Sequence, residues 1–413
     1  MKTQKTRQVV VIGAGAAGFF TAVNAARLNP GLNVTIYEKS RKVLSKVRIS
    51  GGGRCNVTHH CFDPEQLAQA YPRGGKMLRW SFEQFQAKDT VQWFKERGVE
   101  LKTEEDGRMF PVTDDSRTII NCLLNEAQKY GVTVRTQTPV EQIEPLSNGR
   151  FNIFISGEKP HQADAIVVAT GGSNRMKSYQ WLEELGHTVH PPVPSLFTFN
   201  FRNKIFSDLA GISVENARVQ IKGTFISETG PVLITHWGLS GPAVLKLSAW
   251  AARELHKKEY RYDIEVNWLH PANEEDIRRL LLLLRNENAK KQVNKQSRFD
   301  FPNRLWLRFL ELAEIDPQKR WAEISNANIY HLTRELVAGS YNIQGKTTYK
   351  EEFVTCGGIR LNEINPDTLE SKKIPKLYFA GEVLDIDGIT GGFNFQAAWT
   401  NGWLAAQAIA TTL

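Results

Sequence analysis

The sequence predicts an α/β fold in which a nucleotide-binding domain is built from both ends of the chain and interrupted by a β-rich and then a helical segment. Three observations lead to this prediction. The first 40 residues read as strand, glycine turn, helix and strand, the pattern of a parallel βαβ unit. Residues 195–268 carry short alternating runs typical of β structure, and residues 273–338 read as helices. From Tyr349 the chain returns to glycine-rich motifs and ends in a helix.

The secondary structure follows from the hydrophobic patterns, taken in order. Gln8–Gly13 and Asn33–Lys39 are β-branched runs typical of buried parallel strands, and Ala17–Asn29 is the helix between them. Another buried strand is predicted over Gln162–Gly172, where it runs into glycines. The remaining predicted elements are helices Phe82–Arg97, Arg117–Tyr130, Ala243–Leu255 and Gln396–Thr411, and strands Val132–Thr136, Pro139–Glu144 and Phe151–Ser156.

A proline-rich stretch, His190–Phe201, marks the first change in the sequence pattern along the chain. It separates the glycine-rich N-terminal part from the alternating runs. We therefore expect three domains: a discontinuous nucleotide domain of residues 1–191 and 352–413, a β-rich domain of residues 192–270 and 339–351, and a small helical domain of residues 271–338.

The composition is that of a soluble globular protein. The 413 residues are 41% hydrophobic and 23% charged, and this length suggests two or three domains. The N-terminus lacks the pattern of a secretion signal, and the longest aliphatic run, Leu280–Leu284, is too short for a bilayer span of about 20 residues. The four cysteines form no CxxC pair, which favours a reducing compartment. We expect a cytoplasmic protein.

The chain is mildly basic, with a formal charge of +8 and a pI near 9.2. The excess is concentrated in Lys290–Arg308, where aromatic residues are interleaved with basic ones. Such a pattern can bind a phosphate backbone and stack bases. A solvated face of a helical segment is the alternative explanation. RNA is therefore a candidate partner through this stretch, and no membrane partner is expected.

The motif GAGAAG lies between the first strand and the first helix. Gly13 permits the tight turn, Gly15 lets the backbone approach a pyrophosphate, and Gly18 allows close packing of helix on strand. The helix N-terminus stabilises the phosphate charge. Glu38 follows 20 residues after Gly18, at the end of the second strand, where a carboxylate accepts hydrogen bonds from ribose hydroxyls. The register of strand, helix and acid favours a dinucleotide site over a packing turn.

Two further glycine motifs favour FAD over NAD. Ala169–Gly172 ends the buried strand, and Leu377–Gly402 reads as strand, Gly381-Glu382, loop, glycine pair and helix. An acid placed after the strand can bind the ribityl hydroxyls. The N-terminus of the helix that follows faces the flavin O2, where negative charge collects on reduction. The alternative is an ordinary αβ unit at the C-terminus.

The stretch Ile49–Cys61 joins three glycines to an arginine and a cysteine. Glycine amides beside several cations suit an anion-binding loop. Zinc binding is a poor fit, because Cys55, His59, His60 and Cys61 lack paired ligand spacing. Cys55 is either a reactive thiol, with a pKa lowered by the neighbouring Arg54, or a buried structural cysteine.

Thr235–Pro242 lies within the β-rich segment and contains Ser240 in GLSGP, which is not the nucleophile pattern GxSxG. One interpretation is a turn before the helix Ala243–Leu255. The other is a loop that reaches the flavin, with His236 as the proton donor.

These motifs together resemble the BaiN/RdsA-like NAD(P)/FAD-dependent oxidoreductases, a family of bacterial flavoproteins that includes aminoacetone oxidase-like members. The resemblance runs from Val9 to about Gly402, and the combination of SGGGRCN with GEVLDIDGITGGFN is highly specific. It implies a Rossmann-like two-dinucleotide-type FAD domain, an inserted β-barrel-like domain and a small helical domain. It also implies tightly bound, non-covalent FAD.

Carried over motif by motif, the resemblance assigns roles to individual residues. The glycine turn would hold the pyrophosphate, Glu38 the adenosine ribose, Val140 would lie by the adenine, and the C-terminal segment would hold the ribityl chain and flavin ring. The candidate cofactor-binding residues are Gly13, Gly15, Ala16, Ala17, Gly18, Glu38, Lys39, Lys46, Gly51, Gly52, Gly53, Arg54, Cys55, Asn56, Val140, Ala169, Thr170, Gly171, Gly381, Glu382, Gly391, Gly392, Phe393 and Asn394. The candidate catalytic residues are Cys55, His236 and Asp387.

The expected activity is that of an FAD-dependent oxidoreductase. NAD(P)H is the expected reductant, binding transiently because no second GxGxxG is visible. The flavin would then reduce an unsaturated substrate, and the family includes enzymes that convert uridine in large-subunit ribosomal RNA to dihydrouridine. One alternative is an amine oxidase of the aminoacetone type that uses oxygen. Another is an RNA- or ribosome-binding factor in which FAD is structural.

Overall fold

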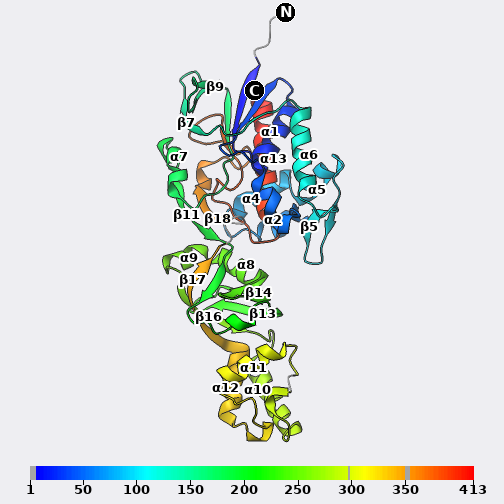
Figure 1. The fold of residues 1–413 in the computed structure, drawn as a ribbon. Helices are drawn as coiled ribbons and strands as arrows, with labels where there is room; N and C mark the ends of the chain where they lie inside the picture. Colours follow the sequence, from blue (N-terminus) through cyan, green and yellow to red (C-terminus); the bar gives the residue numbers. More distant parts are fainter. Residues whose placement is uncertain (1–5, 296–297, 349–353) are drawn as a thin grey trace, which may run out of the picture. The chain divides into compact units, whose positions relative to one another are not determined.

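The structure, a computed structural model, describes residues 6–295, 298–348 and 354–413 (Figure 1). The chain divides into two compact units. The first is formed by Met1–Pro194 and Lys350–Leu413, and the second by Ser195–Tyr349. The first unit therefore draws on both ends of the chain, and the second is inserted within it. Within the described ranges, every helix is too short or too polar to traverse a lipid bilayer.

A parallel sheet lies at the centre of the first unit. Its strand order is β19-β10-β1-β2-β6, and each neighbouring pair is parallel. The strand bounds are β1 (Arg7–Ile12), β2 (Leu32–Tyr37), β6 (Thr133–Arg135), β10 (Ala165–Val168) and β19 (Leu377–Phe379). In the sheet, β2 lies on one side of β1 and β10 lies on the other, so the strand order reverses at β1. Ligands of such sheets bind where the strand order reverses, outside the carboxyl ends of the strands. The predicted α/β class with a Rossmann-like sheet is confirmed.

Two helices pack closely beside this sheet, α1 (Ala16–Leu28) and α13 (Phe393–Thr412), which lie side by side in Figure 1. Small residues permit the approach. A Cβ added at Gly402 would lie 3.0 Å from the Ala17 carbonyl oxygen, and one at Gly381 would lie 2.9 Å from the Ala17 Cβ. The last helix of the chain is thus fixed against the first. The sheet is also accompanied by α6 (Arg117–Lys129), which covers most of the predicted helix Arg117–Tyr130.

The segment between β2 and β6 differs from the prediction in one helix. The predicted helix Phe82–Arg97 is wrong, because the chain breaks at Phe85, which adopts an extended backbone. Gln86 then caps a new helix, and the Asp89 carboxylate accepts from the Gln86 backbone N–H at 2.8 Å, completing a capping box. The elements here are α2 (Ser45–Gly53), β3 (Thr58–His59), α3 (Pro64–Ala68), α4 (Gly75–Gln84), α5 (Ala87–Lys95), β4 (Leu101–Thr103) and β5 (Arg108–Pro111).

In the described part of the first unit, β3, β5 and β4 form a small antiparallel sheet, and two further small sheets lie beside the parallel one. The strands β7 (Val140–Pro145), β8 (Phe151–Ile155) and β9 (His161–Ala163) pair antiparallel. The predicted strand Gln162–Gly172 is therefore two strands, since β9 joins this small sheet and only β10 enters the parallel one. After α7 (Gln180–Glu184), the proline-rich stretch begins within β11 (Val189–Ser195), which pairs with β18 (Val354–Ile359).

A partly buried ionic cluster joins the residues just before β11 to the segment after β18. Glu363 lies 3.1 Å from His187 Nδ1 and 2.8 Å from Lys373 Nζ, and it accepts from the Thr188 N–H at 2.9 Å. Burial opposes ionisation of Glu363, but the hydrogen bonds from Lys373, Thr188 and His187 outweigh it and lower the pKa to about 2. Burial lowers the pKa of His187. The Glu363 carboxylate is therefore stabilised in the folded state.

Replacing Glu363 by glutamine should reduce stability in a pH-dependent way. Because the folded-state pKa is below the unfolded value of 4.5, the contribution is complete above about pH 5 and is lost as pH falls toward 2. Hydrogen bonds to charged groups suggest a loss of about 1–3 kcal/mol at neutral pH. Urea unfolding of the wild type and Glu363→Gln from pH 7 to pH 3 should show the two converging in acid. A constant difference would contradict this explanation.

The second unit contains a closed antiparallel barrel, in the order β12-β15-β14-β13-β16-β17. Residues alternate along the strands: Tyr262 and Ile264 are buried, whereas Arg261 and Asp263 are exposed. The predicted β-rich segment is thus a barrel. The bounds are β12 (Thr198–Phe201), β13 (Ser213–Ile221), β14 (Ser227–Ile234), β15 (Gly238–Ser240), β16 (Arg261–Asn267) and β17 (Gly339–Thr347). The predicted helix Ala243–Leu255 is interrupted at Ala251, giving α8 (Pro242–Trp250) and α9 (Ala252–Lys257).

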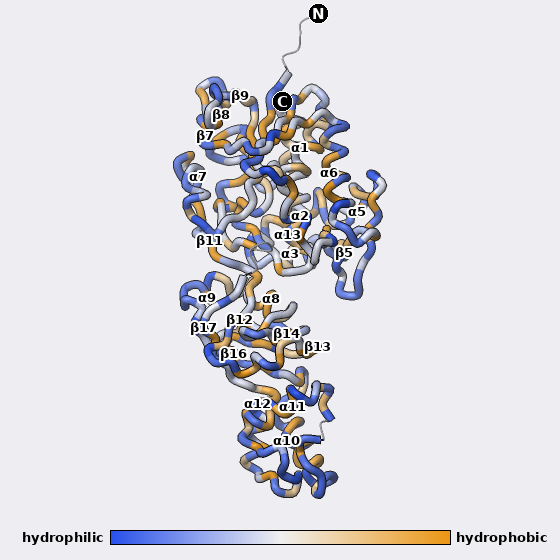
Figure 2. The backbone as a smooth tube through the Cα atoms, in the orientation of Figure 1, coloured by the Kyte–Doolittle hydropathy of each residue, from blue (hydrophilic) through white to orange (hydrophobic). Residues whose placement is uncertain are grey.

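Helices α10 (Glu274–Glu287), α11 (Asn303–Leu312) and α12 (Asn326–Ala338) follow β16 and precede β17. Their buried residues belong to the same hydrophobic core as the barrel. Figure 2 shows hydrophobic and hydrophilic residues interleaved along them, as expected for amphipathic helices. The proposed division of this region into a β-rich and a helical domain stays a prediction.

Candidate functional site

The glycine turn after β1 brings β1, α1 and β10 close together. Gly13 has φ +110°, and a Cβ there would collide with the Ala169 carbonyl oxygen at the end of β10. A Cβ at Gly18 would collide with the Gly13 carbonyl oxygen. At Gly15, by contrast, an added Cβ would meet no atom within 4 Å. Gly13 and Gly18 thus allow close packing, and Gly15 borders open space.

The N-terminus of α1 faces this open space. Gly15 is the N-cap residue, so no side chain caps the first amides of the helix. These amides carry the positive end of the helix dipole. An uncapped helix start behind a glycine turn is suited to a phosphate group. Ala16 and Ala17 occupy the first helical turn, one residue earlier than the predicted start at Ala17.

Glu38 lies beside the same turn, at the end of β2. Its carboxylate accepts from the Ala14 N–H at 2.9 Å and from the Ser40 N–H at 2.8 Å. A carboxylate offers about four acceptor positions, so both oxygens keep capacity for ribose hydroxyls. The chain before β7 also approaches here, since the Thr138 N–H donates to the Glu38 carbonyl oxygen at 2.9 Å. Val140 follows at the start of β7. Lys39 is exposed.

A second polar cluster lies where β10, β18 and the segment after β19 meet. Glu382 accepts from Lys46 Nζ at 2.6 Å and from the Thr355 N–H at 2.6 Å. A Cβ at Gly172 would lie 2.6 Å from Glu382 Oε1. The sequence assigned Lys46 and Glu382 to the cofactor separately. Their pairing also joins the start of α2 to the C-terminal segment.

The three glycines of the Ile49–Cys61 stretch form a tight left-handed turn. Gly51, Gly52 and Gly53 have φ values of +59°, +70° and +87°, and Cβ atoms added at Gly52 and Gly53 would meet nothing within 4 Å. The turn is closed by a 2.9 Å hydrogen bond from the Cys55 N–H to the Ser50 carbonyl oxygen. Residues with side chains rarely adopt such angles. The turn therefore presents bare backbone to open space.

The cysteine and arginine of this stretch are held by other groups. Cys55 is fully buried, and burial raises the pKa of its thiol to about 12, although a hydrogen bond with Ser50 opposes the shift. The prediction of a reactive Cys55 with a lowered pKa is therefore wrong, and the structural alternative fits. Arg54 Nη1 lies 2.5 Å from Glu104 Oε1 and also contacts Asp114, and its guanidinium lies 3.9 Å from the Phe110 ring centre. Arg54 thus already has acidic partners.

Asn56 connects the stretch to the C-terminal segment. In the amide orientation that satisfies both groups, the Asn56 oxygen accepts from the Gly392 N–H at 2.9 Å and its nitrogen donates to the Thr58 carbonyl oxygen at 3.0 Å. His59 stacks on Phe393 at 4.5 Å between ring centres, and its Nδ1 lies 3.0 Å from the Gly391 carbonyl oxygen. The predicted residues around Gly391–Asn394 are thus held against β3.

Asp387 is tied to a segment that sequence reasoning missed. It is fully buried and forms a bidentate pair with Arg73, whose Nε donates to Asp387 Oδ1 at 2.6 Å. The Tyr71 hydroxyl donates to the Phe393 carbonyl oxygen at 2.7 Å, and the Ile389 N–H donates to the Ala70 carbonyl oxygen at 2.9 Å. Residues 70–74 therefore clamp the loop before α13. The motif YPRGG is the signal that could have pointed to this clamp.

A chain of three side chains, also missed, lies between β11 and the same loop. His190 Nδ1 lies 2.5 Å from Asp385 Oδ2, and Arg360 Nε donates to His190 Nε2 at 3.1 Å. Because Nε2 accepts, the ring proton resides on Nδ1 and is donated to Asp385. The arrangement orients the loop after Glu382. No local motif links three residues so far apart in sequence.

His236 and the basic stretch lie in the second unit. His236 is exposed on the turn between β14 and β15, in which Thr235 Oγ1 donates to the Gly238 carbonyl oxygen at 3.1 Å. In the stretch Lys290–Arg308, Trp306 is fully buried and Phe299 nearly so, and their rings lie 5.7 Å apart. The expectation that these aromatics stack on bases is wrong, because they form the core of the helical region.

The groups gathered in the first unit fit FAD. Thr355 Oγ1 and Asn401 Nδ2 are buried polar atoms without a hydrogen-bond partner in the described part of the chain. Thr355 borders Glu382, and Asn401 Oδ1 accepts from the Gly381 N–H at 3.3 Å. A ligand hydroxyl or carbonyl group would satisfy such atoms. Together with the open space at Gly15, they match an extended dinucleotide. Among the described residues, no group of three or more His, Cys, Asp or Glu residues is arranged for a metal ion.

Comparisons with known proteins agree with this arrangement. Residues 7–408 match the family model of the HI0933-like protein Rossmann domain. The chain is 29% identical over 412 residues to the 3-dehydro-bile acid delta(4,6)-reductase of Clostridium scindens, covering 98% of this chain and 99% of the relative. It is 30% identical over 408 residues to the ribosomal RNA dihydrouridine synthase of Escherichia coli, covering 96% of each.

A solved structure shares the fold at low sequence identity. The 3-ketosteroid-delta4-(5alpha)-dehydrogenase from Rhodococcus jostii is 13% identical with a TM-score of 0.52, covering 99% of this chain and 98% of that one. The similarity of fold therefore covers nearly the whole chain and not only the glycine motifs.

Proposed function

The chain belongs to the HI0933-like family, and we propose that it uses FAD and NAD(P)H to reduce uridine to dihydrouridine in large-subunit ribosomal RNA. The chain is a flavin-dependent oxidoreductase of this family, and membership implies FAD as its cofactor. The proposal concerns the substrate, the electron donor and a cytoplasmic location. The main support for an RNA substrate is the 30% identity to the Escherichia coli enzyme over 96% of both chains.

The relatives suggest one reaction class. One name describes a bile-acid reductase and the other the formation of dihydrouridine in ribosomal RNA. Both products can arise by reducing a carbon–carbon double bond conjugated to a carbonyl group, in a steroid ring or in uracil. In uridine, a hydride would add to C6 and a proton to C5, while NAD(P)H would be oxidised to NAD(P)⁺. FAD, when bound, would carry the two electrons between donor and substrate.

The residues of the first unit have binding and orienting roles in this proposal. The α1 N-terminus at Gly15 would stabilise the pyrophosphate charge, and Glu38 would accept from the adenosine ribose. Glu382 and Thr355 would bind the ribityl hydroxyls. The Arg73–Asp387 pair and the Asn56 carboxamide would orient the loop before α13. Cys55 keeps its proton on Sγ at neutral pH, because its pKa is raised to about 12.

A steroid substrate is the second candidate, because identity to the bile-acid reductase is nearly the same, at 29%. The formal charge of +8 favours the polyanionic substrate. Amine oxidation and a purely structural FAD are the remaining alternatives.

We expect NAD(P)H to bleach the flavin absorbance of the purified holoenzyme under anaerobic conditions. Unmodified ribosomal RNA should then restore the colour and gain dihydrouridine by mass spectrometry, whereas a 3-oxo-4,6-diene steroid should not. Restoration by the steroid alone would make the RNA assignment wrong. Failure of NAD(P)H to bleach the flavin would favour structural FAD, and peroxide formation from an amine in air would favour an oxidase.

A further inference from the structure

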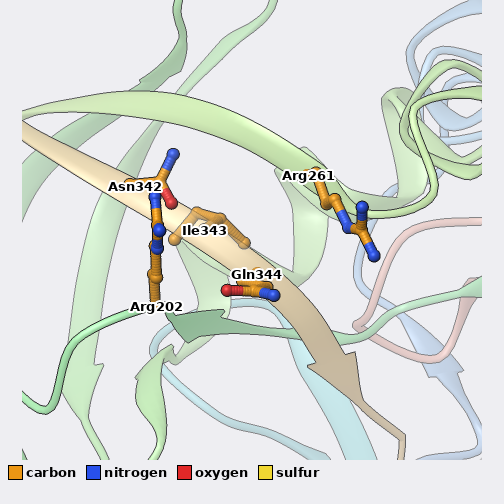
Figure 3. A pocket seen from close by; sticks show the side chains of 5 residues that line it. All are labelled: Arg202, Arg261, Asn342, Ile343 and Gln344. Atoms are coloured by element: carbon orange, nitrogen blue, oxygen red, sulfur yellow. The ribbon is translucent and has the colours of Figure 1, made fainter.

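The outer face of the barrel carries a hollow of about 300 Å³ (Figure 3). It is lined by Arg202, Arg261, Asn342, Ile343 and Gln344. Arg202 directly follows β12, Arg261 begins β16, and the other residues belong to β17. Gln344 is directly opposite Arg261 in the antiparallel register, and Figure 3 shows it between the two arginine side chains. Adjacent strands of one rigid barrel therefore position all five residues.

The two arginines are exposed and make no side-chain hydrogen bond or ion pair in the described part of the chain. Other arginines of the same unit have acidic partners: Arg278 with Glu275, Arg279 with Asp276, Arg298 with Glu287 and Arg308 with Asp208. The nearby Asp263 accepts instead from Asn342 Nδ2 at 2.8 Å. Both guanidinium groups therefore keep their donors available for a ligand.

The lining chemistry suits a phosphate backbone. Two guanidinium groups supply charge and paired donors, and the Gln344 carboxamide can contact sugar or base edges. None of the described residues that line this hollow carries a carboxylate. The larger hollow beside α11 is different, because three basic residues share it with four acids. These acids are Asp208, Glu311, Glu314 and Asp316. A polyanion would be repelled there and attracted at the barrel face.

We propose that the barrel face at Arg202 and Arg261 binds the sugar–phosphate backbone of the RNA substrate. The inference rests on the proposed function, and it names the surface that would hold RNA. It differs from the expectation based on Lys290–Arg308, where Phe299 and Trp306 are buried and where Arg298 and Arg308 already have acidic partners.

The test compares two double variants of the holoenzyme with equal loss of charge. Arg202→Ala/Arg261→Ala removes the proposed contacts, and Arg278→Ala/Arg279→Ala removes two arginines paired with acids on α10. Binding of a fluorescein-labelled single-stranded RNA is measured by anisotropy over a series of salt concentrations. The first variant should bind about 10-fold more weakly, and its slope of log K against log salt should fall in magnitude by about 1.4, for two lost contacts. The second should bind like the wild type.

The remaining outcomes separate the surface from the function. If the wild type forms dihydrouridine and both variants bind RNA equally well, the surface assignment alone is wrong. If the first variant loses affinity for NADP⁺ and keeps its affinity for RNA, the hollow holds a dinucleotide phosphate and the proposal is overturned. If the wild type neither binds nor modifies RNA, the proposed function is wrong and the surface assignment falls with it. Circular dichroism and flavin content verify that each variant is folded.

Discussion

Arg73→Ala should cause a large loss of stability and release FAD. Asp387 is fully buried, and the side chain of Arg73 is only 11% exposed, so removing the guanidinium deprives a buried carboxylate of its bidentate ion pair. Breaking a buried pair in this way costs about 3–5 kcal/mol. For a unit of this size, that corresponds to a fall in Tm of about 10 °C. The loop before α13 would lose its clamp, so FAD should separate from the protein during gel filtration.

Two further variants test this explanation. Arg117→Ala removes an arginine that is 72% exposed and pairs with Asp115, so its Tm should change by less than about 1 °C. Arg73→Met/Asp387→Leu replaces both charges by apolar groups, and it should recover much of the stability lost in the single variant. Calorimetry and flavin absorbance provide the measurements. An Arg73→Ala protein that melts like the wild type and retains FAD would refute the clamp.

Gly15→Val should greatly weaken FAD binding while leaving the fold intact. Gly15 has φ −90°, which any residue adopts, and an added Cβ meets no protein atom within 4 Å. The valine side chain would instead fill the space at the start of α1 where a pyrophosphate would lie. A loss of about 2–3 kcal/mol of binding free energy corresponds to an FAD affinity reduced by about 100-fold. Titration of the apoprotein with FAD, followed by fluorescence quenching, measures this effect.

Gly13→Ala provides the contrast. Gly13 has φ +110° and lies against the Ala169 carbonyl oxygen, so a methyl group there strains the backbone and separates β1 from β10. This variant should lose thermal stability even without cofactor, whereas apo Gly15→Val should unfold within about 2 °C of the wild-type apoprotein. Normal FAD affinity in Gly15→Val would show that the open space is not the pyrophosphate site.

The features that sequence predicted well are local in the chain. The β1–α1–β2 unit could be predicted because strand, glycine turn, helix and Glu38 lie within 32 residues and each follows a simple spacing rule. The β-rich segment followed from alternation, which fixes one face of each strand toward the core, whereas its barrel form was implied only by the family resemblance. The α/β class with an inserted β region is therefore encoded in short patterns.

The features that sequence did not predict depend on distant contacts or on competing local signals. Phe82–Arg97 has a helical pattern throughout, yet the capping box at Gln86 and Asp89 starts a new helix. Arg73 and Asp387 are 314 residues apart, and neither has a motif that names its partner. The aromatics near Trp306 resembled a base-stacking surface because sequence alone does not reveal which face of a helix is buried. For the Arg73–Asp387 pair and for the aromatics, the missing information was three-dimensional proximity.

The insertion of the second unit has a consequence for biosynthesis. Strand β10 pairs with β19, but Leu377 is synthesised roughly 200 residues after Val168. At about 5–20 residues per second, the ribosome needs roughly 10–40 s to cover that interval. During this time one edge of the sheet in the nascent chain is incomplete, and α13 is not yet present to pack against α1. The barrel can fold first, whereas flavin loading must await the last helix, so chaperone dependence should be greatest for the N-terminal segment.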